Sequence, residues 1–280
     1  MVTASHGTLS LDQTSAYPLA EGGAPLSLPG SGARGRIGIV FIHGFTGRPS
    51  SVAPVVKALN ARGFSVEAPR LPGHGTDVKD MLGTRYTDWR EHVRRVTLAL
   101  SEHVDAIVVA GLSMGGTLAI DIGTLCLPKV VGIVPINAQI LDRKGLAVRF
   151  APFIGKVMPL APAALAGLKR NDVKKPCVDE HAYKSTPVLA GHSLVEALPQ
   201  VREHLPAIRV PVLVVRSRED HSVNPANSIA LLQSLPNAIV SELVLENSYH
   251  VATLDYDAEL LIDRITEFAD QAGNVHVARV

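Results

Sequence analysis

The sequence has little of two patterns that mark whole classes of proteins, cysteine frameworks and metal-ligand clusters. Only two of its 280 residues are cysteines, Cys126 and Cys177, and they stand in unrelated contexts. Two thiols leave room for a single bridge and exclude the disulfide framework of a small secreted domain, so they favour a reducing compartment. The sequence has no CxxC pair and no Cys/His cluster, and we therefore expect no metal site.

Net charge and long apolar runs are also scarce. Lys and Arg total 27 while Asp and Glu total 26, so the net charge of +1 provides neither a basic field for nucleic acid nor an acidic tail. No apolar run approaches the ~20 residues that cross a membrane, and the N-terminal MVTASHGTLSLDQ lacks the basic start and apolar centre of a signal peptide. We expect a soluble cytoplasmic protein, a monomer or homodimer, without a nucleic-acid partner or integral membrane association.

Hydrophobic residues, in contrast, make up 46% of the chain, enough for a large core in one domain. Short β-branched runs such as RIGIVFI (36–42), DAIVVA (105–110) and KVVGIVPI (129–136) alternate with amphipathic helical patterns. This alternation predicts an α/β fold, with a mostly parallel sheet covered by helices on both faces. Ligands bind such sheets at the carboxyl ends of the strands, so the residues just after a strand are candidates for a site.

The stretch from residue 138 to 198 interrupts this alternation. It shows no clear strand, and its apolar first half carries three prolines. We expect short helices that form an inserted cap, while residues 1–137 and 199–280 form the core. The first 35 residues are rich in Gly, Ser and Pro, which predicts an irregular start or an edge strand.

The segment VVAGLSMGGTLAI (108–120) begins like a strand and ends like a helix, with Ser113 among Gly111, Gly115 and Gly116. Side chains two residues before and after this serine would crowd the strand and the helix, so the glycines indicate a sharp turn. The pattern G-x-S-x-G is that of a nucleophile elbow, which presents the serine at a helix N-terminus, where negative charge is favoured. An ordinary Ser N-cap is the alternative explanation.

A second motif, FIHGFTG (41–47), follows the first strong strand. With GLSMGG it makes the chain resemble the α/β-hydrolase superfamily, and bacterial carboxylesterases and monoacylglycerol lipases in particular. The resemblance covers residues 36–271 and implies an eight-stranded-type, mostly parallel sheet with helices on both faces and a small helical cap. It also implies that the backbone amides of Phe45 and Met114 form an oxyanion hole, and it gives His43 a structural role.

An acid and a base follow late strands of the predicted sheet. Asp220 in REDHSV lies just past the strand VPVLVV, and His250 in SYHVATLD lies just past the last strand. Both loops resemble the acid and histidine loops of the family. The chain order Ser113, Asp220, His250 is also that of α/β-hydrolases and differs from the orders in chymotrypsin and subtilisin. These residues therefore predict a catalytic triad.

Other titratable residues near these loops are weaker candidates. Glu219 adjoins the acid and would point elsewhere on an extended loop, and His221 adjoins it on the other side. Asp255 and Asp257 follow the base and are expected near the positive end of the last helix. His74, in RLPGHG, is expected in a structural turn.

For an α/β-hydrolase these residues imply ester hydrolysis through an acyl-enzyme, without a cofactor. The expected substrate is a small-molecule ester of short to medium acyl length, or an acylglycerol. Carbon–carbon bond hydrolysis, peptidase or perhydrolase chemistry, and non-catalytic binding of a small molecule remain alternatives, because the fold does not determine the function. Serine at the elbow disfavours the related dehalogenases and epoxide hydrolases, which have Asp there.

The apolar part of the expected cap supplies candidates for the substrate pocket, because ligand pockets are mostly apolar. The candidates are Phe150, Phe153, Ile154 and Met158. Each could equally serve only to pack the cap against the core. His192 is expected in the helix that leads from the cap to the core, away from the catalytic chemistry.

Overall fold

The computed structural model describes residues 15–143, 145–162 and 171–277. Within them, seven strands form one sheet in the order β1-β3-β2-β4-β5-β8-β9, parallel except at the first edge, where β1 pairs antiparallel with β3. The strands are β1 (Leu26–Leu28), β2 (Ile37–Ile42), β3 (Ser65–Ala68), β4 (Ala106–Leu112), β5 (Val130–Ile136), β8 (Val212–Ser217) and β9 (Val240–Leu245). The predicted α/β fold class is confirmed, and the described residues give this sheet seven strands where the expected type has eight.

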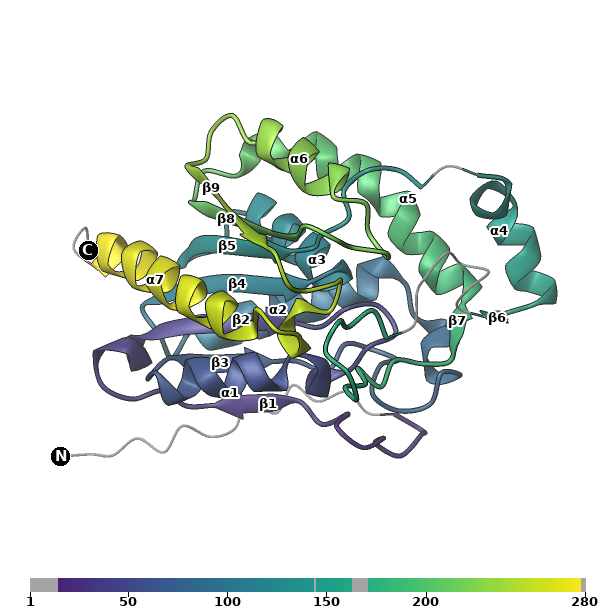
Figure 1. Ribbon diagram of the computed structural model, residues 1–280, viewed down its shortest axis with the longest axis horizontal. Coiled ribbons are helices and arrows are strands. Elements are labelled where there is room, and N and C mark those ends of the chain that lie inside the picture. Colours follow the sequence, from purple (N-terminus) through teal and green to yellow (C-terminus); the bar gives the residue numbers. More distant parts are fainter. Residues whose placement is uncertain (1–14, 144, 163–170, 278–280) are drawn as a thin grey trace.

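Helices cover both faces of this sheet (Figure 1). Helices α1 and α7 pack on one face, and α2, α3, α5 and α6 supply apolar residues to the core on the other. Their bounds are α1 (Ala53–Ala61), α2 (Tyr86–Ser101), α3 (Met114–Thr124), α5 (Val188–His204), α6 (Ala226–Gln233) and α7 (Ala258–Val277). Every residue of β2, β4 and β5 is buried because both faces are covered, which explains their unbroken apolar sequences.

The parallel strands end at one edge of the sheet, and this edge positions the candidate site. Strands β2, β4 and β8 end at Ile42, Leu112 and Ser217, and each predicted site residue of the core follows a strand end within a few residues. Short 3-10 helices lie in several connections, at Ala33–Arg36, Pro49–Ser51, Asp80–Gly83, Leu205–Ala207 and Ala252–Leu254.

The chain between β5 and β8 (residues 137–211) extends beyond this edge and is called the insertion below. It contains α4 (Leu146–Val157), a two-stranded antiparallel ribbon of β6 (Leu160–Pro162) and β7 (Ser185–Pro187), and α5. The prediction that this region has no strand is wrong, because strands of three residues are too short to show a period-two pattern. The predicted border at residue 198 lies inside α5.

Helix α5 joins the insertion to the core without a break. Near its start α4 packs closely against it, since a Cβ on Gly155 would lie 2.6 Å from Leu189 Cδ2. Further along, Leu198 and Val201 are buried in the core. One helix therefore supports both regions, and the insertion has no separate core boundary at this end.

Two expectations from composition can be compared with the structure. Cys126 and Cys177 are both free and exposed. Within the described part of the chain, none of the helices is both long and apolar enough to span a bilayer.

Candidate active site

The turn at Ser113 has the geometry that its glycines predict. Ser113 separates β4 from α3 with φ 57° and ψ −120°, a conformation that non-glycine residues rarely adopt. A Cβ on Gly111 would lie 2.2 Å from the Gly115 carbonyl oxygen, and a Cβ on Gly115 would lie 2.2 Å from the Ile42 carbonyl oxygen. The Ser113 amide donates to the Ile136 carbonyl at 2.8 Å. The serine is thus held by backbone at the N-terminus of α3.

The two predicted oxyanion-hole residues lie beside this serine. Met114 is the first residue of α3, so no carbonyl one turn earlier in the helix can accept from its amide. Phe45 is on the loop after β2, where a Cβ on Gly44 would lie 3.4 Å from Ser113 Cβ. Phe45, Met114 and Ser113 line one cavity.

His43 anchors the loop that carries Phe45. Its Nε2 accepts from the Leu71 amide at 3.3 Å, so the ring proton is on Nδ1, 2.9 Å from the Gly44 carbonyl oxygen. Burial lowers the pKa of His43 to about 4, which keeps the ring neutral. These contacts support the structural role expected for this histidine.

Behind the same loop, four rings pack together. The centroids of His43, Phe45, His74 and Trp89 lie 5.0 to 6.3 Å apart in neighbouring pairs. His74 Nδ1 and Trp89 Nε1 each lie 3.0 Å from the Pro72 carbonyl oxygen. His74 is fully buried in a turn, as expected, and the cluster gives the Phe45 loop a rigid support.

Asp220 and His250 form a hydrogen-bonded pair across two loops. Asp220 Oδ2 lies 2.8 Å from His250 Nδ1, and Asp220 Oδ1 accepts from the amides of Ser222 and Val223, each at 2.8 Å. The Asp220 side chain is only 2% exposed. Both carboxylate oxygens are therefore occupied, and Nε2 is left as the ring nitrogen that can act on a neighbouring hydroxyl.

The surroundings of His250 favour its protonated form. Burial lowers the pKa of the ring, but the carboxylates of Asp220, Glu180 and Asp172 raise it, and the net shift is upward from 6.5. The adjacent Asp220 carboxylate stabilises the imidazolium, so His250 can hold a proton that it takes from a hydroxyl.

Two polar residues that the sequence analysis missed fix the His250 loop. Asn137 follows β5, and its Nδ2 donates to the His250 carbonyl at 2.8 Å and to Ser217 Oγ at 3.0 Å. Ser217, at the end of β8, donates from Oγ to the Tyr249 carbonyl at 2.7 Å. Their position at strand ends is a signal that sequence analysis could have used, since three strand ends meet at this loop.

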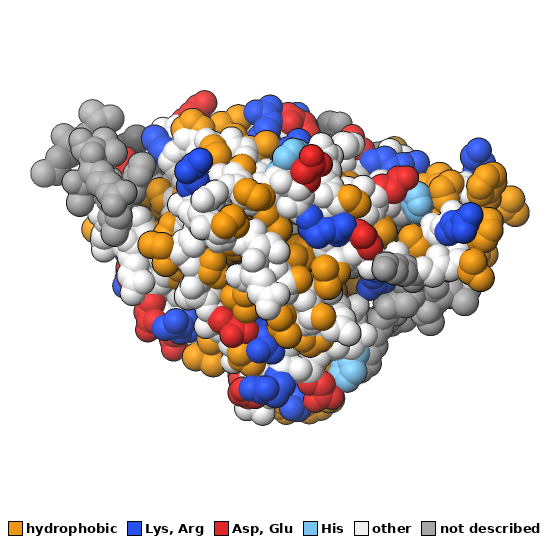
Figure 2. Space-filling view, turned by 90° about the horizontal axis from the view of Figure 1, so that it is seen from above, with side chains coloured by type: hydrophobic (Ala, Val, Ile, Leu, Met, Phe, Trp, Pro, Cys, Tyr) orange, Lys and Arg blue, Asp and Glu red, His pale blue; other side chains and the backbone are white. Residues whose placement is uncertain are grey.

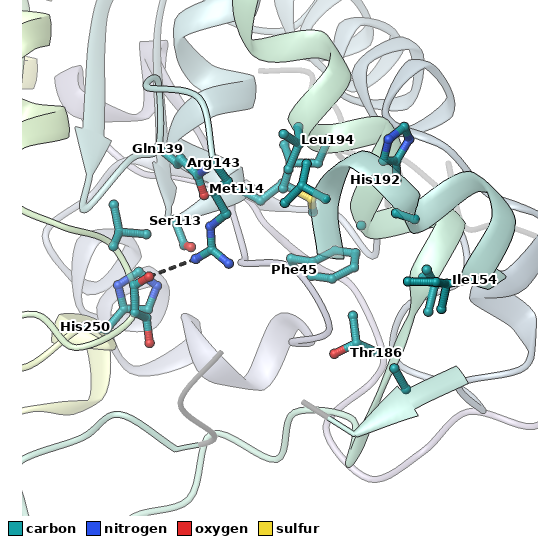
Figure 3. A pocket seen from close by; sticks show the side chains of 18 of the residues that line it. Phe45, Ser113, Met114, Gln139, Arg143, Ile154, Thr186, His192, Leu194 and His250 are labelled. Atoms are coloured by element: carbon teal, nitrogen blue, oxygen red, sulfur yellow. Dashed lines mark hydrogen bonds between the residues drawn. The ribbon is translucent and has the colours of Figure 1, made fainter. Parts of the chain in front are cut away.

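Ser113 and His250 open into one cavity of about 330 Å³ (Figure 3). Its other walls come mostly from apolar residues of the insertion, on α4 and α5. In Figure 3, Ser113 and His250 lie at one end of the view and Ile154 at the other. The cavity therefore joins the sheet edge to the insertion.

Helix α4 turns only one of its two apolar faces to this cavity. Val148, Ala151 and Ile154 of α4 line it, spaced three residues apart as helical geometry requires, and Met158, the residue after the helix, lines it too. Phe150 and Phe153, the other two cap candidates, are not among the residues that line this cavity, and they are 47% and 69% exposed. Figure 2 shows hydrophobic side chains gathered at the end of the molecule where α4 lies.

Two polar residues of the cavity also escaped the sequence analysis. Arg143 donates from Nη2 to the Ser222 carbonyl at 2.9 Å; burial lowers the pKa of its guanidinium, and Asp220 opposes that shift. Thr186 on β7 is 4% exposed, and its Oγ1 has no hydrogen-bond partner among the described residues. In Figure 3 the Thr186 hydroxyl lies on the side toward His250. A buried hydroxyl without a partner costs ~1–3 kcal/mol, and at the cavity wall this hydroxyl can hydrogen-bond a molecule bound there.

The weaker candidates have other partners. Glu219 is exposed and lies 3.2 Å from His221 Nε2. Asp257 accepts from the Asn247 amide at 2.7 Å, and Asp255 accepts from the Tyr249 amide at 2.9 Å. His192 lines the cavity, with Nδ1 3.1 Å from Glu196. Within residues 15–143, 145–162 and 171–277, no three His, Cys, Asp or Glu side chains are placed to hold a metal ion.

The parallel sheet, the strained serine turn after β4 and the Asp–His pair at the carboxyl edge define an α/β-hydrolase. Residues 34–257 match the family described as serine aminopeptidase, S33, and the chain belongs to this family.

The chain is also similar to proteins whose activities are named. The chain is 37% identical over 258 residues to a thermostable monoacylglycerol lipase of Bacillus sp. (strain H-257), covering 92% of this chain and 98% of the relative. It is 27% identical over 237 residues to a carboxylesterase of Bacillus subtilis (strain 168), covering 83% and 92%. A solved structure from work on the metagenome-derived lipolytic enzymes LipS and LipT is 33% identical, with a TM-score of 0.83 over 91% of this chain and 100% of that one.

Proposed function

We propose that this protein is a carboxylic ester hydrolase that cleaves monoacylglycerols and other esters of short to medium acyl length through an acyl-enzyme on Ser113. The observation that carries the proposal is the 2.8 Å contact between Asp220 and His250 at a cavity that Ser113 also lines. The similarity to a monoacylglycerol lipase and a carboxylesterase supports an ester as the substrate.

In this mechanism His250 Nε2 takes the proton of Ser113 Oγ as that oxygen bonds to the ester carbonyl carbon. The amides of Phe45 and Met114 hold the oxyanion, and Asp220 stabilises the imidazolium. The alcohol leaves with the proton from His250. Water, activated by the same histidine, then attacks the acyl-enzyme and releases the acid.

The insertion acts as the proposed cap, and α4 and α5 bind the acyl chain. Apolar lining residues such as Ile154 and Leu194 support this assignment, because each buried methylene contributes ~0.8 kcal/mol. The value of kcat/KM should therefore rise from acetate to medium-chain esters and fall once the chain exceeds the cavity.

The polar residues of the cavity bind the alcohol part. Thr186 has an unpaired buried hydroxyl, and Arg143 presents a guanidinium close to the Asp220 loop. A glycerol ester carries hydroxyl groups that these side chains can hydrogen-bond, and a methyl ester carries none. A cytoplasmic location and a monomeric or homodimeric state stay part of the proposal.

The test compares monoacylglycerols with methyl esters of the same acids. Thr186→Val keeps the shape of the side chain and removes the hydroxyl, so kcat/KM for the glycerol esters should fall about tenfold, the effect of losing ~1.4 kcal/mol. Thr186→Ser is the matched control and should retain the glycerol-ester activity. Methyl esters should be cleaved equally well by all three proteins. An equal loss on both ester types would refute the assigned alcohol site.

The same panel tests the reaction itself. If the wild-type protein cleaves no ester and Ser113 is not labelled by a fluorophosphonate, the proposed function is wrong. A carbon–carbon bond hydrolase or a binding protein then becomes the better hypothesis.

A further inference from the structure

Part of the insertion lies between the loops that carry the acid and the base. This part is residues 171–175, called the clamp segment here; the acid loop is residues 218–223 and the base loop is residues 246–251. Asp172 of the clamp segment is buried, with its side chain 0% exposed. A buried carboxylate is retained only where hydrogen bonds compensate for lost hydration, so its partners define its role.

The partners of Asp172 come from both loops. Its Oδ1 lies 2.8 Å from His221 Nδ1, and its Oδ2 accepts from the His221 amide at 3.0 Å. Ser222 Oγ lies 3.5 Å from Oδ2. On the other side, the Asp172 carbonyl accepts from the Val251 amide at 3.0 Å. Asp172 thus contacts the two residues that follow Asp220, and it also contacts Val251, which follows His250.

Asp255 forms a second connection between the clamp segment and the base loop. Its carboxylate accepts from the amides of Lys174 at 2.7 Å, Lys175 at 3.0 Å and Tyr249 at 2.9 Å. The loops also touch directly, because the rings of His221 and Tyr249 meet edge to face with centroids 4.6 Å apart. The clamp segment is therefore bonded to both loops through side chains and backbone.

We propose that Asp172 is a positioning residue that sets the geometry of the Asp220–His250 pair, so that the insertion completes the catalytic site as well as covering it. The route is short. Asp172 holds His221 and Ser222, and the Ser222 amide donates to Asp220 Oδ1 at 2.8 Å. Through Val251 it also holds the residue next to His250. A displacement of about 1 Å at reacting groups can cost a hundredfold in rate, so these contacts bear directly on kcat.

A purely structural role for Asp172 makes a different prediction from a positioning role. The charged groups around His250 are Asp220, Glu180 and Asp172, with Arg143 close to Asp220 and His221 against Asp172. The Asp172 carboxylate favours the protonated ring, so its neutralisation lowers the pKa of His250. A change that only loosens the fold would reduce activity without moving the pH profile.

The experiment uses Asp172→Asn in the full-length protein, with Glu219→Gln as the matched control. Glu219 also lies next to His221, but its side chain is 56% exposed. For Asp172→Asn we expect kcat to fall between tenfold and a hundredfold at unchanged KM, and the acidic limb of kcat/KM to move to lower pH. Glu219→Gln should stay within twofold of wild type, with the same pH profile.

Wild-type kcat and an unmoved acidic limb in Asp172→Asn would overturn the inference. The inference rests on the proposed ester hydrolysis, but the two fail differently: a wild type without ester activity refutes the function, whereas an active wild type with a neutral Asp172→Asn refutes the positioning role. If Asp172→Asn does not fold, His221→Gln replaces it. That variant removes the ring contact with Asp172 and should lower kcat several-fold at unchanged KM; an unchanged kcat would contradict the proposal.

Discussion

The sheet edge and α4 of the insertion hold their side chains by different means. At the edge, Ser113 is fixed by backbone hydrogen bonds and close glycine contacts, and Asp220 by two amides and a histidine. Helix α4 instead rests on α5 through side chains, and leaves Phe153 and Val157 69% and 89% exposed. The proposed reacting groups thus lie where backbone contacts fix them, and the proposed acyl contacts lie on a helix that is held by side chains and is partly exposed. Variants at the edge should change kcat, and variants on α4 should change which ester is preferred.

Ser113→Ala makes the sharpest test of the edge. Loss of the nucleophile in a triad lowers kcat by about a million-fold, because none of the remaining groups can form the acyl-enzyme. Ester hydrolysis and labelling by a fluorophosphonate probe should both disappear, while circular dichroism stays that of the wild type. Substantial turnover by this variant would exclude the mechanism.

Asp220→Asn should have the next largest effect. The amide cannot hold the His250 ring in the tautomer that takes a proton at Nε2, so kcat should fall by about ten-thousand-fold. Glu219→Gln, one residue away, should change kcat little, because Glu219 lies on the exposed side of the loop. If steady-state kinetics showed a larger effect for Glu219→Gln than for Asp220→Asn, the acid of the triad would be Glu219.

On α4, a pair of neighbouring residues separates the two faces of the helix. Ile154 lines the cavity, whereas Phe153 points away from it. Ile154→Ala removes part of the proposed acyl wall, so kcat/KM for medium-chain esters should fall about tenfold, with acetate esters nearly unaffected. Phe153→Ala should leave both substrates unchanged. A chain-length profile of the two variants checks this, and equal effects would mean that α4 is not an acyl-binding wall.

The contrast between the sheet edge and α4 also explains which residues could be predicted from the sequence. Ser113, Asp220 and His250 follow strands, and strand direction alone brings the ends of β4, β8 and β9 to one edge. Phe45 and Met114 are assigned to the oxyanion hole only by the resemblance to the α/β-hydrolase family, because backbone amides leave no signal in the side-chain pattern. In the insertion, an apolar sequence does not say which side chains meet the cavity, so it offers Phe150 and Phe153 as candidates together with Ile154 and Met158, and only the last two line it.

Other contributions had no signal in the sequence. Asp172 is 49 positions before His221, and only the folded insertion brings them together. Thr186 lies in a three-residue strand without a recognisable pattern, and its proposed role depends on a hydroxyl that has no partner in the described residues. Such contacts between distant segments are set by tertiary packing.

The smallest effect on ester hydrolysis is expected for a residue inside the sheet and far from the cavity, Glu67 on β3, which should change stability instead. The Glu67 side chain is buried beside Ser27, whose Oγ donates to Glu67 Oε1 at 2.6 Å. Burial raises the pKa of Glu67 from 4.5 to about 7, although the hydrogen bond from Ser27 lowers it. Between these two values the folded protein keeps a proton that the unfolded chain has released. Stability should therefore fall as the pH rises from 4.5 to 7, by up to ~3 kcal/mol, and stay lower above pH 7.

Glu67→Gln removes this titration and keeps an oxygen that can accept from Ser27. The variant should melt like the wild type in weak acid and several degrees higher above neutral pH, since ~1 kcal/mol corresponds to ~2–4 °C in a domain somewhat smaller than this one. Thermal melts across the pH range measure the effect, with the exposed Glu102→Gln as control. Ester hydrolysis should not change, because Glu67 lies away from the site-bearing loops. A wild-type melting curve that is flat across this window would show that the carboxylate is ionised in the folded sheet, and altered ester kinetics in Glu67→Gln would show that the sheet and the site are coupled.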